Sequence, residues 1–152
     1  MTDNGFALLE RFNRTLRELD RVYHEMARTS GLSDCAFWTM YALYGAEEPL
    51  PQKEISQTWQ YSKQTVASAL QQLVRRGLVQ VRLAEGSRRD KVIELTDEGL
   101  GFARRHLLPV AQAEQAALAG LGAEGAEELL DRLDGYTSLL GTLADERGLC
   151  GA

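Results

Sequence analysis

The chain has 152 residues, of which 44% are hydrophobic and 26% are charged, a composition that suits a globular domain with its own core. This composition excludes collagen-like and disordered chains, and no apolar run approaches the roughly 18 residues that a membrane-spanning helix needs. Cys35 and Cys150 lack the spacing of a disulfide framework or metal site, and Cys150 lies in the tail. The N-terminus does not resemble a secretory signal, so we expect a cytoplasmic location.

The net charge of −5 is unevenly distributed along the chain. Residues 53–91 hold eight basic and three acidic residues, a net charge of +5, whereas the rest holds nine basic and nineteen acidic residues, a net charge of −10. A basic centre between acidic arms is typical of a domain that binds a polyanion. A surface that is patchy by accident would have the same distribution, so charge alone leaves both interpretations open.

Three helices are predicted in the first part of the chain. Apolar residues recur at three- and four-residue spacing over residues 6–26 and predict a long amphipathic helix, which Gly31 ends. Ser33 is placed to cap a second helix that runs to residue 45. Proline favours the first turn of a helix, so a third, short helix is predicted over residues 51–58.

A fourth helix is predicted from the cap residue Ser62 to Arg76, directly before Gly77. Its apolar side chains share one arc of a helical projection: Val66, Ala69, Leu70, Leu73 and Val74. The opposite arc is polar but nearly uncharged: Tyr61, Gln64, Thr65, Ser68, Gln71 and Gln72. A helix that is merely solvated tends to carry Glu and Lys there, whereas Gln, Ser and Thr are suited to base edges.

A β-hairpin and two further helices are predicted in the rest of the chain. Residues 78–83 and 91–95 alternate between apolar and polar and form the hairpin, whose tip is basic. Thr96 begins a fifth helix, which Pro109 should kink near its middle. Residues 120–122 break this helix, and a sixth helix with a leucine-rich stripe follows.

Helix, turn, helix and a two-stranded wing is the order of a winged helix-turn-helix, and four segments of the chain resemble the multiple-antibiotic-resistance regulator (MarR) family. The segments are PQKEIS at 51–56, SKQTV at 62–66, LVRRGLV at 73–79 and LTDEG at 95–99. The resemblance covers roughly residues 32–100 and implies a mainly α (α+β) fold. It implies one chain unit, 1–152, with the winged helix-turn-helix at 32–96 and a helical dimerisation part at 1–31 and 97–152.

The resemblance further implies a homodimeric transcription regulator, a repressor that a small molecule releases from an inverted-repeat operator. Its fourth helix would enter the major groove of double-stranded DNA, and its wing would reach the minor groove. The expected DNA-binding residues are Ser62, Lys63, Gln64, Thr65, Ser68, Gln72, Arg82, Arg88, Arg89 and Lys91.

Two positions depart from the family pattern. Ala67 and Ser68 stand where the family often has Ser-Arg, so a common arginine contact is missing from the fourth helix. Residues 84–89 replace the usual Asp-x-Arg-Asp-x-Arg of the wing, so an Asp–Arg pair that would stiffen the wing is also missing. Arg89 keeps the last arginine of that motif.

In the family, an effector cavity lies where the dimerisation helices meet the winged part. The residues of this chain that would reach such a junction are Phe12, Tyr23, Phe37, Trp38, Tyr41 and His106. Aromatic walls with a few polar tips suit a small aromatic or phenolic ligand. The same spacing equally suits an ordinary core, so both interpretations stay open here.

Other chemistry is poorly supported by the sequence. His24 and His106 lie in different predicted helices and have no metal-ligand spacing, and no nucleophile or phosphate-binding motif is present, so we expect no enzyme, metal or cofactor. Two alternatives to the ligand-responsive regulator remain. One is a winged-helix module that binds protein, and the other is a redox-sensing regulator that uses Cys35, although a cysteine in this position is more often structural.

Overall fold

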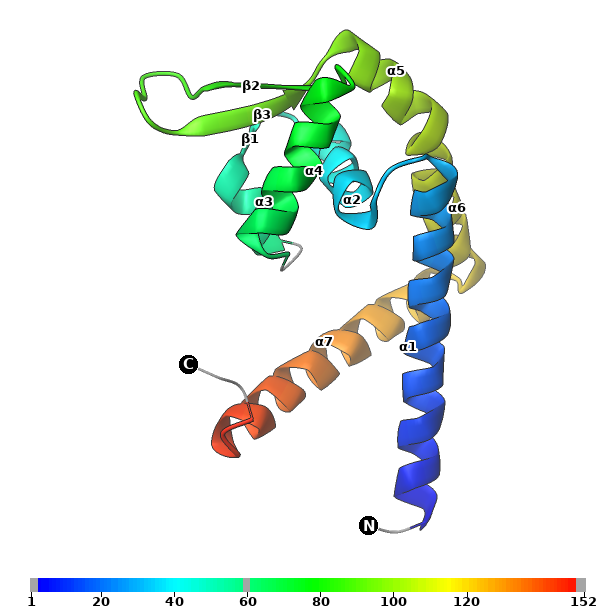
Figure 1. Ribbon diagram of the computed structural model, residues 1–152. Helices are drawn as coiled ribbons and strands as arrows, with labels where there is room; N and C mark the ends of the chain where they lie inside the picture. Colours follow the sequence, from blue (N-terminus) through cyan, green and yellow to red (C-terminus); the bar gives the residue numbers. More distant parts are fainter. Residues whose placement is uncertain (1–2, 59–60, 150–152) are drawn as a thin grey trace. The chain divides into compact units, whose positions relative to one another are not determined.

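A computed structural model describes residues 3–58 and 61–149 and divides the chain into two compact units, Met1–Val110 and Ala111–Ala152 (Figure 1). Trp59 and Gln60, which we placed in a turn, and Cys150, which we placed in the tail, lie outside the described residues. The functional division expected at residues 31 and 96 stays a prediction. None of the described helices is both long and apolar enough to cross a membrane.

The first two predicted helices are present, and the first extends three residues beyond each end of the apolar pattern at 6–26. Helix α1 spans Asp3–Thr29 and α2 spans Asp34–Gly45. Gly31, with φ of 72°, occupies the left-handed region between them, a conformation that glycine adopts at little cost. Ser33 caps α2 because its side chain accepts a hydrogen bond from the Ala36 N–H at 3.4 Å.

Our prediction for Pro51 was wrong. Leu50–Pro51 forms a short strand, β1, and helix α3 begins one residue later and spans Gln52–Thr58. β1 pairs with the wing, with Leu50 opposite Ile93 and Pro51 opposite Val92. Proline is tolerated here because β1 is an edge strand, where a missing N–H does not interrupt a ladder on both sides.

The wing is therefore part of a three-stranded antiparallel sheet with the order β1-β3-β2. β2 spans Val79–Leu83 and β3 spans Lys91–Leu95, in the register that sets Val81 opposite Ile93. Helix α4, which spans Lys63–Arg75, packs on β2 as well as on α2. Ser62 caps α4, and Gly77 ends it with φ of 69°.

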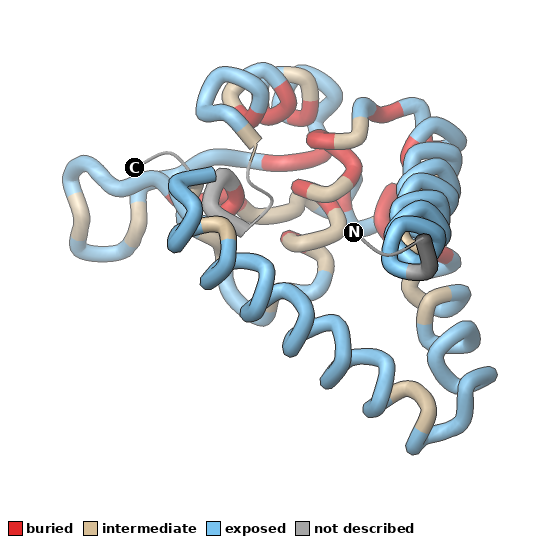
Figure 2. The backbone as a smooth tube through the Cα atoms, turned by 90° about the horizontal axis from the view of Figure 1, so that it is seen from below, coloured by how far each residue is buried: buried red, intermediate tan, exposed pale blue. Residues whose placement is uncertain are grey.

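Helix α5 spans Asp97–His106, α6 spans Leu108–Gly120 and α7 spans Ala123–Glu146. The predicted kink at Pro109 is a break between α5 and α6, because proline has no N–H to continue the ladder of α5. Gly122, with φ of 75°, begins α7 after the predicted interruption. In α7 no described residue is buried within the single chain (Figure 2).

The core of the first unit is built around α2, which contacts α1, α4, α5 and β3. Phe37 and Met40 of α2 are fully buried, as are Leu73 of α4 and Ile93 of β3. Burying such a side chain contributes about 1.5–3 kcal/mol, so α2 is the element that supports both α4 and the wing.

The start of α5 is fastened to the end of α4 by close backbone contacts. Thr96 donates its hydroxyl to the Gly77 carbonyl at 2.6 Å and caps α5 by accepting the Gly99 N–H at 3.0 Å. A Cβ atom at Gly99 would overlap the Leu78 backbone carbonyl. A Cβ atom at Gly101, two residues later in the same helix, would meet nothing within 4 Å. The two glycines of α5 therefore have different roles.

We expect Gly99→Ala to lower the free energy of unfolding by about 3 kcal/mol, because the backbone of Leu78, directly before β2, would have to move. Gly101→Ala is the matched control and should raise it by about 0.5–1 kcal/mol, since alanine favours the helix. Urea denaturation of both variants measures the difference. Equal effects of the two substitutions would contradict the close approach of α5 to Leu78.

An ion pair connects α1 to the first turn of α2. His24 Nδ1 lies 2.9 Å from Asp34 Oδ2, and both side chains remain about half exposed. The hydrogen bond and the charge of Asp34 raise the pKa of His24 above its ordinary value, with smaller contributions from Glu25 and Asp20. The pair is therefore sensitive to pH.

Because the folded-state pKa is raised, the ion pair stabilises the fold fully below the unfolded value of about 6.5, and its contribution is lost as the pH rises through the raised pKa. We expect the thermal midpoint of His24→Gln to lie below that of the wild type at about pH 5.5 and close to it at about pH 8.5. A midpoint difference of the same size at both pH values would show that the charge of His24 does not contribute.

Candidate nucleic-acid interface

Helix α4 presents its polar side chains to solvent because its apolar face is buried against α2. Val66, Ala69, Leu70 and Leu73 are buried, as the helical projection predicts, whereas Val74 of the same predicted arc is exposed because it lies at the edge of that arc. The exposed residues of the first two turns are Lys63, Gln64, Thr65 and Ser68. This surface combines amide and hydroxyl groups with a lysine at its N-terminal end.

Thr65 takes part in the N-terminal cap of α4. Thr65 Oγ1 lies 2.7 Å from Ser62 Oγ, and the Thr65 N–H donates to Ser62 Oγ at 3.1 Å. Ser62 and Thr65 are thus engaged with each other, whereas Gln64 and Ser68 present an exposed amide and an exposed hydroxyl beside Lys63.

Two residues expected on the outward arc are set back from it. Tyr61 precedes the cap, so the helical projection does not apply to it, and its ring packs against the core, where burial raises the pKa of its hydroxyl. Gln72 is half-buried and lines a hollow together with Cys35 of α2.

Gln71 and Arg75 are exposed on α4, although we did not include them among the expected DNA-binding residues. They follow Ser68 by three and seven residues, a spacing that returns to the same face of a helix. This spacing was visible in the sequence and could have identified both residues. Arg75 adds a second cation to the surface, at the opposite end of the helix from Lys63.

The strands of the wing are joined by a polar side-chain network. Gln80 Nε2 donates to Glu94 Oε1 at 2.7 Å, and Arg82 Nε donates to both carboxylate oxygens of Glu94 at 3.1 Å. These hydrogen bonds hold the pKa of Glu94 below its usual value. Arg82, which we expected to bind DNA, is thus paired within the wing.

The tip of the wing is held by Ser87. Its hydroxyl donates to Asp90 Oδ2 at 2.8 Å and accepts the N–H groups of Arg89 at 3.2 Å and Asp90 at 3.0 Å. The Ala84 N–H closes the loop on the Asp90 carbonyl at 2.8 Å. This network stiffens the tip of the wing in place of the Asp–Arg pair of the family, which this chain lacks.

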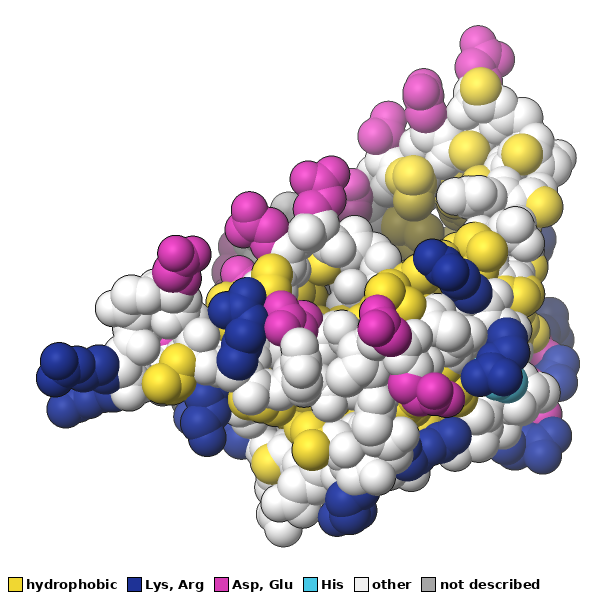
Figure 3. All heavy atoms as spheres, turned by 90° about the horizontal axis from the view of Figure 1, so that it is seen from above, with side chains coloured by type: hydrophobic (Ala, Val, Ile, Leu, Met, Phe, Trp, Pro, Cys, Tyr) yellow, Lys and Arg dark blue, Asp and Glu magenta, His cyan; other side chains and the backbone are white. Residues whose placement is uncertain are grey.

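Cations project from the tip of the wing (Figure 3). Arg88, Arg89 and Lys91 are all exposed. Arg89 and Lys91 also line a hollow of about 510 Å³ together with Lys53 of α3 and Asp90, so that three basic side chains and one carboxylate border one surface depression. Such an arrangement concentrates positive potential where a phosphate backbone would pass.

Arg76 has a structural role, although it lies in the basic segment. Its Nη1 donates to the Gly31 carbonyl at 3.1 Å, and its guanidinium lies 5.4 Å from the centre of the Phe102 ring. Arg76 therefore connects the end of α4 to the turn between α1 and α2 and to α5.

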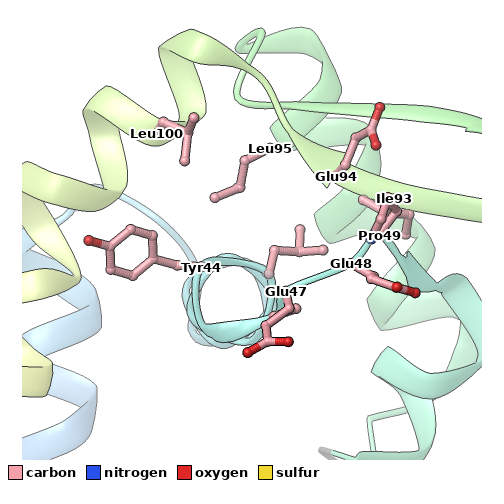
Figure 4. A pocket seen from close by; sticks show the side chains of 10 residues that line it. Tyr44, Glu47, Glu48, Pro49, Ile93, Glu94, Leu95 and Leu100 are labelled. Atoms are coloured by element: carbon pink, nitrogen blue, oxygen red, sulfur yellow. The ribbon is translucent and has the colours of Figure 1, made fainter.

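A hollow at the other end of α2 has the opposite charge. It has a volume of about 260 Å³ and lies between the end of α2, β3 and α5, with Glu47, Glu48 and Glu94 among its lining residues (Figure 4). Its apolar side includes Tyr44 and Leu100. Carboxylates repel phosphate, so this side of the winged part is unsuited to a nucleic acid.

The aromatic residues of the expected effector site come together in part. The Trp38 ring lies 5.2 Å from Tyr23 and 5.4 Å from Tyr41, measured between ring centres, and Phe37 beside it is fully buried. The two other expected residues are half-buried. They are Phe12 on α1 and His106, whose ring lies 4.5 Å from Phe102 on α5.

Cys35 is buried in the first turn of α2, and burial raises the pKa of its thiol. Redox-active cysteines are accessible and have a lowered pKa, so this environment disfavours the redox-sensing alternative. Among the residues that the structure describes, no group of three or more His, Cys, Asp or Glu side chains is arranged to hold a metal ion.

Residues 30–90 match a family model described as the MarR family. The comparison with curated proteins gives no match. The matched segment contains α2, α3, α4 and most of the wing, and therefore almost the entire surface described above.

Solved structures share the fold. A MarR family regulator from Neisseria meningitidis is 22% identical, with 92% of this chain and 98% of that chain covered and a TM-score of 0.78. The complex of Staphylococcus aureus MepR with DNA is 22% identical, with 86% and 96% covered and a TM-score of 0.68. The PcaV transcriptional regulator from Streptomyces coelicolor, solved with its natural ligand, is 26% identical, with 88% and 91% covered and a TM-score of 0.55.

Proposed function

We propose that this chain, which has the sequence pattern and the fold of MarR family regulators, is a sequence-specific DNA-binding repressor of transcription. The observation that carries the proposal is the exposed hydrogen-bonding surface of α4, uncharged between Lys63 and Arg75, beside a wing whose tip carries Arg88 and Arg89. Amide and hydroxyl groups are suited to base edges, and exposed cations are suited to phosphates. The complex of MepR with DNA supports this use of the fold.

In the proposed complex, α4 lies in the major groove and the wing reaches the adjacent minor groove. A two-fold dimer would place two copies of α4 about one helical turn apart, so the operator should be an inverted repeat with half-site centres separated by roughly 10–10.5 bp. The symmetry of the bound sequence is the feature that a protein-binding winged-helix module would not produce.

A double variant of Arg88→Ala and Arg89→Ala should weaken binding to all DNA sequences and reduce the slope of log affinity against log salt by about two units. Mobility shifts on upstream DNA of this chain's own gene, at several salt concentrations, measure both effects. Arg104→Ala with Arg105→Ala changes the net charge equally on the exposed surface of α5 and is the matched control. A slope equal to that of the wild type would place the wing outside the interface.

The dimer is proposed from apolar side chains that the single chain leaves exposed. In α1 they include Phe6, Leu8 and Leu19, which are 59%, 68% and 50% exposed. In α7 they are Leu129, Leu130, Leu133, Tyr136, Leu139, Leu140 and Leu143. Stripes of this length are larger than the apolar patches of ordinary monomers, and a second copy of the chain would cover them.

Sedimentation at micromolar concentration should therefore give twice the monomer mass of 16.9 kDa. Leu139→Glu, at a position that is 66% exposed in the single chain, should shift the equilibrium toward monomer because a charge would be buried in the interface. Glu128→Gln removes a charge from α7 without adding one to its apolar stripe and serves as the control. A wild-type monomer at this concentration would rule out the dimer.

We further propose that a small aromatic or phenolic effector binds at the aromatic side chains around Trp38 and releases the operator. The T-shaped contacts of Trp38 with Tyr23 and Tyr41 provide flat walls with hydroxyl groups. The structure of PcaV with its natural ligand supports ligand response on this fold. An effector would act only through its difference in affinity for the free and the DNA-bound dimer.

The coupling must be reciprocal, so a phenolic compound that weakens operator binding should itself bind more weakly, by the same factor, when operator is present. Trp38→Phe should reduce compound binding and leave operator affinity without the compound unchanged. Isothermal titration with and without operator DNA measures both. If the response to the compound survives Trp38→Phe and Tyr41→Phe unchanged, these rings belong to the core alone.

A further inference from the structure

The central part of α4 carries no charge, which restricts the bases that it can read. The eleven residues from Gln64 to Val74 lie between Lys63 and Arg75 and include no charged side chain. Bidentate recognition of guanine in the major groove uses arginine or lysine, and recognition of cytosine uses a carboxylate. Direct readout of G·C pairs therefore lacks its usual partners along the middle of this helix.

Adenine and thymine have partners on the same surface. Gln64 and Gln71 are exposed, and a glutamine amide can donate to N7 and accept from N6 of adenine. The Thr65 hydroxyl is engaged by Ser62, so the cap leaves these amides and Ser68 as the hydrogen-bonding groups of the surface.

An apolar hollow lies beside Gln71, between α4 and the wing, with Gln52 of α3 also among its lining residues. It has a volume of about 330 Å³ and is lined on the α4 side by Ala67 and Val74 and on the wing side by Val81. Val74 and Val81 are 46% and 39% exposed, which leaves an apolar surface between two elements that both face the proposed DNA.

Lys91 lies at the edge of this hollow. A glutamine amide, an apolar wall and a cation thus occur side by side. Thymine presents a methyl group next to an acceptor oxygen, and its backbone presents a phosphate, so the three features match one thymine nucleotide and its paired adenine.

We infer that α4 reads an A·T-rich half-site, in which Gln64 and Gln71 bind adenine and Ala67, at the hollow beside the wing, contacts the 5-methyl group of thymine. The inference rests on the proposed DNA binding and adds the chemistry of the recognised bases. Arg88 and Arg89 at the wing tip agree with it, because the narrow minor groove of A-tracts attracts arginine.

The first test is selection of bound sequences from a random duplex pool by the full-length protein. The enriched half-site should be A·T-rich at the positions under α4. Thymines of the best site are then replaced one at a time by deoxyuridine, which removes only the 5-methyl group. One thymine in each half-site should show a loss of affinity of about fourfold, the value of one buried methyl group.

Two variants assign the contacts. Ala67→Gly should abolish the difference between thymine and uracil, whereas Ala42→Gly, which removes the methyl group of a half-buried alanine in α2, should retain it. Gln71→Arg should change the preferred base at one position from adenine to guanine by at least about fivefold. A side chain with a merely structural role would not change base preference in this way.

The outcomes separate the two proposals. Sequence-specific binding to a G·C-rich half-site, or binding that is equal for thymine and uracil at every position, would overturn this inference and leave the DNA-binding function intact. Binding without any sequence preference would overturn the proposed function itself.

Discussion

The packing of one face of α4 on α2 is the constraint on which the other features of the winged part depend. Val66 and Leu73 are buried against a helix whose own side chains Phe37 and Met40 are fully buried, so α4 cannot rotate without exposing apolar surface. Each buried side chain of this size contributes about 1.5–3 kcal/mol. The polar face is thus fixed outward by the burial of the opposite face, and its chemistry does not have to stabilise the fold.

The wing also has a fixed conformation, but a buried face is not what provides it. It has little core of its own, since only Val79, Val92 and Ile93 of its two long strands are buried. Hydrogen bonds supply its order, through Glu94 between the strands and Ser87 at the tip. Each such hydrogen bond outside the core contributes little free energy, so the order of the wing depends on the network as a whole and not on one pair.

Much of this architecture could be predicted from residues that act locally. Ser33, Ser62 and Thr96 cap helices where the sequence indicated, because capping involves only the next three residues. β1 was missed because two residues have no periodicity and its pairing with Ile93 depends on contacts distant in sequence. The pairing of Arg82 with Glu94 was missed for the same reason, since the register of the strands decides it. The hydrogen bond from Ser87 to Asp90 joins residues only three apart, so it was a local feature that the sequence offered and our prediction did not include.

Arg76 connects elements of the winged part that are distant from one another in the sequence. It ends α4, bonds to the Gly31 carbonyl between α1 and α2, and lies over Phe102 of α5, whose ring in turn contacts His106. A ligand that displaced α5 or the turn at Gly31 would have to stretch one of these contacts or move the end of α4 with them. The contacts of Arg76 therefore link the end of α4 to α5 and to the turn between α1 and α2. In the proposed regulator, an effector that acted through these contacts would not have to touch the DNA.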